Sequence, residues 1–151
     1  MNNKIKILGH PLHAMLVCFP VAFYTGTLAG YITYNSNHDP FWFKVAVVAN
    51  IAGVVMAAVA ALPGFIDWLF LPSDSGAKRT GLFHMVCNVL ALVCYTIVAF
   101  TECKKWDDPE PIPGLAIPLT AVGFLLTLIV GLLGWTLVQK HHVGVDDVAK
   151  N

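Results

Sequence analysis

The stretch VAVVANIAGVVMAAVAALPGFI, residues 45–66, decides the fold of this chain, because it contains no Asp, Glu, Lys or Arg. A transmembrane helix needs about 20 mostly apolar residues to cross a hydrocarbon layer about 30 Å thick. Three more stretches without a charged residue follow the same pattern, at residues 7–38, 80–101 and 112–139. The chain has 151 residues, of which 57% are hydrophobic and 12% charged. This composition indicates a membrane protein rather than a soluble domain.

We predict an all-α fold, an antiparallel four-helix transmembrane bundle with spans at about residues 11–34, 43–69, 82–100 and 115–138. At this length only helices satisfy their own backbone hydrogen bonds in lipid. The links between the spans are short and contain the Pro, Gly, Asn and Asp that end helices. A single membrane domain, residues 1–151, accounts for the chain. A signal peptide over residues 1–30 is the competing interpretation, but histidines and prolines fit its apolar region poorly.

The distribution of basic residues predicts the orientation. The face shared by both termini carries six of them and the other face three; these are Lys4, Lys6, Lys78, Arg79, Lys140 and Lys150 against Lys44, Lys104 and Lys105. The positive-inside rule therefore predicts that both termini lie in the cytoplasm. The net charge of zero argues against nucleic acid as a partner.

The histidines gather at one end of the predicted bundle. Five lie at the end shared by the termini, and the sixth lies at the other end: His10, His13, His84, His141 and His142, then His38. A single histidine at a helix end is usually an interfacial side chain. Imidazoles from three helices at the same end instead indicate ligands for a haem iron or another transition metal.

Four of these histidines are the candidate ligands, namely His10, His13, His84 and His141. His10 and His13 are three residues apart and would share a face on a helix, although Pro11 suggests that His10 occupies the cap position rather than the regular turn. We expect His142, which is turned about 100° from its neighbour, to face solvent.

Two polar residues are expected to support the imidazoles. Asp67, near the end of the second span, would accept the free N–H of a ligating histidine and fix its tautomer. Asn88, one turn after His84, would form an interhelical hydrogen bond. We expect no polar path through the middle of the bundle, which argues against a transporter.

Small residues recur at helical spacing in the second and fourth spans; they are Gly53, Ala57, Ala61 and Gly64, and Gly123, Thr127, Gly131 and Gly134. Such faces let a backbone or a flat ring approach closely. Because Gly64, Gly131 and Gly134 lie nearest the histidines, we expect them to admit a porphyrin. Ordinary helix packing is the alternative. The four cysteines form no C-x-x-C or C-x-x-C-H motif, which argues against covalently attached haem.

Several motifs together resemble one family; they are GHPLH at residues 9–13, Asp67 with Trp68, His84 with Asn88, and His141 with VGV at residues 143–145. Over nearly the whole chain they are similar to the bacterial predicted membrane proteins of domain-of-unknown-function family 2231. Some relatives look like fusions to Rieske-type iron–sulfur domains, so the resemblance implies redox partners. Relatives often carry Pro, His and Gly where this chain has Ala14, Cys18 and His142, so a ligand one turn deeper is absent here.

Three functions follow from these features. The first is a b-type haem protein for electron transfer, with His13 and His84 as axial ligands and quinone or a Rieske-type or other redox protein as partner. It would be the membrane component of an oxidoreductase. The second is a non-haem site for Zn, Cu or Fe, and the third is a non-catalytic membrane subunit of a redox complex. A homodimer through the small-residue faces is left open.

Overall fold

The computed structural model describes residues 6–8, 10–110 and 114–145. Its elements, in chain order, are β1 (Lys6–Ile7), β2 (His10–Pro11), α1 (Leu12–Leu16), α2 (Cys18–Asn37), α3 (Pro40–Leu69), α4 (Gly76–Glu102), the 3-10 turn η1 (Cys103–Lys105) and α5 (Ala116–Gln139). Four helical segments, counting α1 and α2 as one, are long and apolar enough to cross a membrane. The predicted all-α class with four membrane-spanning helices is therefore confirmed.

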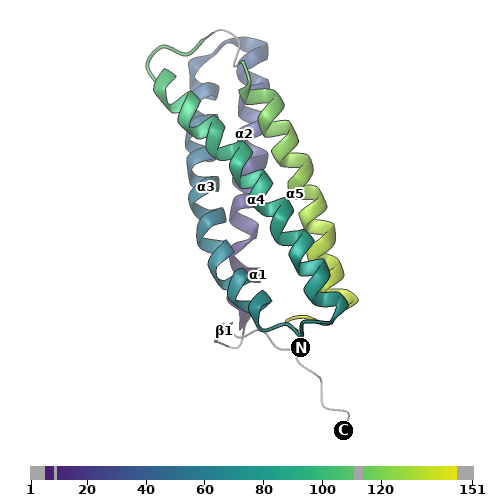
Figure 1. Cartoon of the computed structure of the whole chain (residues 1–151). Helices are drawn as coiled ribbons and strands as arrows, with labels where there is room; N and C mark the ends of the chain where they lie inside the picture. The colour runs from purple at the N-terminus through teal and green to yellow at the C-terminus, as the bar shows by residue number, and fades with distance from the viewer. Residues whose placement is uncertain (1–5, 9, 111–113, 146–151) are drawn as a thin grey trace.

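The four long helices lie side by side, with the α4–α5 pair in front of the α2–α3 pair in Figure 1. Contacts join α2 to α3, α3 to α4, α4 to α5 and α5 to α2, which places α2 and α4 on one diagonal of the bundle. Gly30 of α2 packs on Ala46 early in α3, whereas His13 of α1 packs on Gly64 late in α3. The first two spans therefore run in opposite directions.

The first span is broken at Val17, between α1 and α2. Pro20 explains the break, because it has no N–H and its ring crowds the carbonyl of Leu16, four residues earlier. Helical bonding continues on each side, with the Val17 N–H donating to the His13 carbonyl at 3.1 Å. His13 consequently sits on a short helix of its own, packed against α3.

His10 does not occupy the helix cap, so that expectation was wrong. Pro11 is the N-cap residue, with extended angles φ −66° and ψ 119°. His10 pairs with Ile7 in a two-residue antiparallel ribbon and is exposed. A residue before proline is driven toward extended backbone, which explains why helix begins only after Pro11. His10 and His13 therefore do not share a helical face.

Most helix ends lie within three residues of the predicted spans, and the largest difference is at the start of α4. This helix begins at Gly76, because the side chain of the N-cap residue Ser75 accepts a hydrogen bond from the Lys78 N–H at 3.1 Å. The predicted start at residue 82 followed the apolar core and missed the charged first turn. At α3, the N-cap Asp39 and Pro40 at the first helical position mark the start in the same way.

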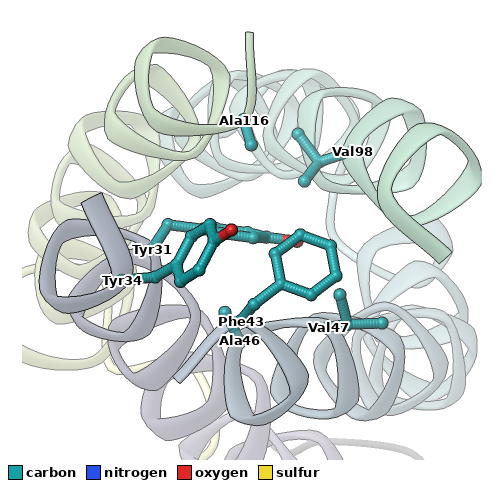
Figure 2. Close-up of a cluster of buried hydrophobic side chains, with 7 residues drawn as sticks. All are labelled: Tyr31, Tyr34, Phe43, Ala46, Val47, Val98 and Ala116. Carbon is teal, nitrogen blue, oxygen red and sulfur yellow. The ribbon is translucent and has the colours of Figure 1, made fainter. Parts of the chain in front are cut away.

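Away from the histidines, the core is a cluster of buried side chains contributed by all four spans; it consists of Tyr31, Tyr34, Phe43, Ala46, Val47, Val98 and Ala116 (Figure 2). The Phe43 ring meets Tyr31 and Tyr34 edge to face, at centroid distances of 6.1 and 5.4 Å. Large apolar side chains such as Leu132 and Phe100 are about two-thirds exposed on the outside. This outer surface fits a lipid bilayer, in which exposed apolar groups are not penalised.

Candidate functional site

Two of the predicted ligands meet across the bundle. His13 on α1 and His84 on α4 have ring centroids 6.1 Å apart, with their planes at 78°. They are far apart in sequence and lie on the two diagonally opposed segments. The diagonal pair chosen from the sequence is thus a neighbouring pair in the structure, and its binding of a metal stays a prediction.

Both imidazoles are held by backbone carbonyls. His13 Nδ1 lies 2.8 Å from the Ala60 carbonyl oxygen, and His84 Nδ1 lies 3.1 Å from that of Val130. A carbonyl can only accept, so in each ring Nδ1 carries the proton and donates it. Each neutral ring then keeps a lone pair on Nε2, and neither Nε2 has a hydrogen-bond partner among the described residues. This is the tautomer in which histidine ligates metals through Nε2.

Glycines provide the space for these two rings. A Cβ at Gly64 would lie 2.7 Å from the His13 ring, and one at Gly134 would lie 3.4 Å from His84 Cε1. Gly131 differs, because nothing lies within 4 Å of its Cβ position. Two of the three glycines expected to admit a flat ring therefore admit an imidazole, and their contact with a porphyrin stays a prediction.

The same ring-on-glycine contact recurs one layer deeper in the bundle. The Tyr24 ring lies against Gly53, where a Cβ would approach it to 2.8 Å, and the Tyr95 ring lies against Gly123, where the distance would be 2.6 Å. The two tyrosines stack face to face across the diagonal, at a centroid distance of 3.6 Å and an angle of 1°. Each half of the bundle thus contributes one histidine and one tyrosine.

This pattern is an internal repeat that was missed in the sequence. His84 and Tyr95 follow His13 and Tyr24 at one common spacing, and Gly123 and Gly134 follow Gly53 and Gly64 at an almost identical one. The carbonyls that hold the two imidazoles, at Ala60 and Val130, are separated by the same spacing as the glycines. A comparison of the first half of the chain with the second would have revealed it. The histidine pair therefore joins equivalent positions of two helical hairpins.

The other predicted ligands lie apart from this pair. His10 is exposed in β2, and His142 is exposed as expected. His141 follows the end of α5 and packs against the start of α4. Its Nε2 lies 3.4 Å from Thr80 Oγ1, and its Cε1 would lie 2.9 Å from a Cβ at Gly76. Within residues 6–8, 10–110 and 114–145, no three His, Cys, Asp or Glu side chains are arranged to hold one metal ion.

The two polar residues that were expected to support the imidazoles, Asp67 and Asn88, differ in burial. Asp67 is half-buried near the end of α3. The Asn88 amide donates to the His84 carbonyl of its own helix at 3.0 Å and is exposed, so it does not act on the His84 ring.

The link between α3 and α4 has a contact that the sequence did not reveal. Trp68 Nε1 donates to the Lys78 carbonyl at 3.0 Å, and Lys78 Nζ donates to the Trp68 carbonyl at 2.7 Å. Lys78 Nζ also lies 4.0 Å from the Trp68 ring centroid, where the ammonium is attracted to the face of the ring. These contacts tie the helix of His84 to the end of α3.

The middle of the bundle is not apolar, which corrects another expectation. Among the residues that the structure describes, four buried polar ones lie within it or at its far end; they are Thr27, Asn50, Glu102 and Thr120. The hydroxyls of Thr27 and Thr120 donate to carbonyls of their own helices at 2.8 and 2.6 Å. A threonine bonded in this way can lie in an apolar helix interior, so the sequence pattern did not reveal these two as a polar feature. The argument against a polar path through the bundle therefore no longer holds.

Four membrane-spanning helices with a shared imidazole pair at one end define the class, a multi-pass α-helical membrane protein. Residues 9–147 match the family model described as "Predicted membrane protein (DUF2231)", so the chain belongs to this family. No curated protein and no solved structure matches the chain.

The ring-on-glycine packing makes a first prediction. Gly123→Ala is expected to lower the free energy of unfolding by about 1–3 kcal/mol, because its Cβ would press into the rigid Tyr95 ring. Gly131→Ala, in the same helix but with open space at its Cβ, should be neutral or stabilising by up to about 1 kcal/mol. Unfolding of purified protein in mixed detergent micelles measures both. Equal stability of the two variants would contradict this account of the glycines.

Proposed function

We propose that this protein binds one b-type haem between His13 and His84 and transfers electrons within the membrane. The observation that carries the proposal is the geometry of the pair. With bonds of about 2.0–2.1 Å to Nε2, each imidazole centroid lies roughly 3 Å from the metal, so two rings can share one metal only when their centroids are within roughly 6 Å of each other. The observed separation is 6.1 Å, and both rings have the required tautomer.

The number of converging ligands favours haem over a bare metal ion. Zinc sites use three or four protein ligands, and in the described part of the chain only two imidazoles converge. A porphyrin supplies four nitrogens of its own and needs only axial ligands from the protein. A pair of histidines on opposite segments is the donor set that such a group requires.

The residues of the chain would hold and tune the bound group. Haem supplies one-electron chemistry, and its potential depends on the axial ligands, their hydrogen bonds and the surrounding dielectric. Here the Ala60 and Val130 carbonyls make both imidazoles more basic by accepting their Nδ1–H groups. This stabilises the higher charge of the oxidised iron and so lowers the potential.

The basic residues suggest which side of the membrane the site faces. Lys78 and Arg79 lie in the first turns of α4, at the same end of the bundle as His84. By the positive-inside rule, this end faces the cytoplasm of a bacterial inner membrane. Electrons would pass between the haem and quinone or a Rieske-type redox protein, with the bundle as the membrane component of an oxidoreductase.

An absorption spectrum tests the proposal. Protein purified in detergent, or reconstituted with added haem, should show the reduced-minus-oxidised bands of a six-coordinate haem at one haem per chain. Elemental analysis of the same sample is the companion measurement. Absence of haem bands after reconstitution would refute the proposal, and stoichiometric zinc or copper in a haem-free sample would favour the non-haem alternative.

A further inference from the structure

The half of the bundle away from the histidine pair contains buried polar atoms that the protein leaves without partners. In the described residues these are Tyr24 Oη, Tyr31 Oη, both amide atoms of Asn50 and Glu102 Oε2. Their residues are 0–4% exposed. A buried polar atom without a hydrogen bond destabilises the folded state, so five such atoms in one region indicate that a molecule outside the chain bonds to them.

The register of the helices places these groups one after another along the axis of the bundle. Gly53 packs on the Tyr24 ring and Ala46 packs on Gly30, so Asn50 lies between these two levels. Tyr24 and Tyr31 are two turns apart on α2, about 10 Å along the axis at about 1.5 Å per residue. Asn50 therefore lies at an intermediate level between the two tyrosines.

The internal repeat supports the same order. Tyr95, the equivalent of Tyr24, donates its hydroxyl proton to the Thr120 carbonyl at 3.2 Å. At the spacing that relates Gly123 to Gly53, the residue equivalent to Thr120 in the first hairpin is Asn50. By the repeat, we infer that the Tyr24 hydroxyl lies on the Asn50 side of the stack, where it has no hydrogen-bond partner among the described residues.

Glu102 connects this row to the surface. Glu102 lies one turn after Val98, which shares a buried cluster with Tyr31, and it is the repeat equivalent of Tyr31 at the spacing that relates His84 to His13. Glu102 Oε1 accepts a hydrogen bond from Lys105 Nζ at 3.1 Å, and the same Nζ donates to Glu110 at 3.1 Å. The Glu110 side chain is 59% exposed, so the row reaches the aqueous face at this end of the bundle.

The polar groups in this row, from Tyr24 through Asn50 and Tyr31 to Glu102, determine what kind of molecule can bond to them. Two phenols and an amide offer both donors and acceptors, and the Glu102 carboxylate is already paired with the Lys105 ammonium. A neutral group that donates and accepts satisfies such a set, whereas an additional cation would meet the Lys105 charge. Water fits, since a buried water typically makes about three hydrogen bonds to otherwise unpaired groups.

We propose that ordered water molecules bridge Glu102, Tyr31, Asn50 and Tyr24, so that this half of the bundle is a water-filled half-channel open toward the Glu102 end. It ends at the Tyr24–Tyr95 stack, because rings 3.6 Å apart leave no room for water between them. The half-channel does not depend on haem binding, and it brings water from the far face to the middle of the membrane.

X-ray hydroxyl-radical footprinting of the full-length protein in detergent tests the proposal, because radicals form at bound waters. Tyr31 and Phe43 provide a matched pair, since both are 0% exposed and their rings are neighbours. After correction for intrinsic reactivity, Tyr31 should be labelled severalfold faster than Phe43. Labelling of Tyr31 as slow as that of Phe43 would overturn the half-channel.

Asn50→Leu is the second arm of the test. It removes the polar middle of the row while keeping a branched side chain of the same number of heavy atoms, so labelling of Tyr24 should fall severalfold. Phe43 labelling and helix content, measured on the same sample, report whether the variant remains folded. Unchanged Tyr24 labelling in a folded variant would exclude a chain of waters through Asn50. Because His13→Ala should leave Tyr31 labelling unchanged, failure of haem binding and failure of the half-channel are separate outcomes.

Discussion

Alanine at either His13 or His84 is expected to abolish six-coordinate haem binding. Loss of a group that only supports a metal ligand weakens binding by about 10–100-fold, so loss of a ligand itself should exceed roughly 100-fold. The two variants should behave alike, since both rings are held by carbonyls in equivalent positions. Titration of purified apoprotein with haem, followed by absorption, measures the effect.

Exposed histidines supply the controls for this experiment. His142→Asn and His38→Asn should bind haem as the wild type does, and asparagine is chosen because both residues have a left-handed φ, 52° and 55°. Free imidazole added to His84→Gly should restore the six-coordinate spectrum if His84 acts as a ligand. Wild-type binding by both alanine variants, or loss of binding in His142→Asn, would refute the assigned pair.

The fold was predictable because the signal that determines it is local. Charge-free stretches of sufficient length predict membrane helices from composition alone, and residues 45–66 did so without any knowledge of packing. The pairing of His13 with His84 followed from the order of four helices. The ends of the helices were harder to predict from the sequence. The start of α4 depends on the cap at Ser75, and the break at Val17 depends on Pro20.

The details of the site required knowledge of the helix register. No local pattern shows that the carbonyls of Ala60 and Val130 accept the imidazole protons, or that Gly64 faces His13. The burial of Asn50 likewise depends on which face of its helix turns inward. The repeat of one helical hairpin by the next was the long-range signal that the sequence did contain.

Tyr95→Ala is expected to lower the free energy of unfolding by about 3–5 kcal/mol, the range for deleting a large buried aromatic ring. Tyr95 is 0% exposed, packs on Gly123 and stacks on Tyr24, so its loss leaves a cavity at the centre of the bundle. Phe100→Ala, on the same helix but 68% exposed to lipid, should change stability by less than about 1 kcal/mol. Equal losses from the two variants, measured by unfolding in mixed micelles, would show that the stack does not stabilise the bundle.

Removing only the hydroxyl groups separates packing from hydrogen bonding at the same two rings. Tyr95→Phe loses the bond to the Thr120 carbonyl and should destabilise the protein by about 1 kcal/mol. Tyr24→Phe removes a hydroxyl for which the protein supplies no partner among the described residues. In a dry bundle this change would be stabilising, because an unpaired buried group disappears. With water bonded to the Tyr24 hydroxyl, the loss should instead match that of Tyr95→Phe, because both variants then remove one satisfied hydrogen bond from equivalent positions of the repeat.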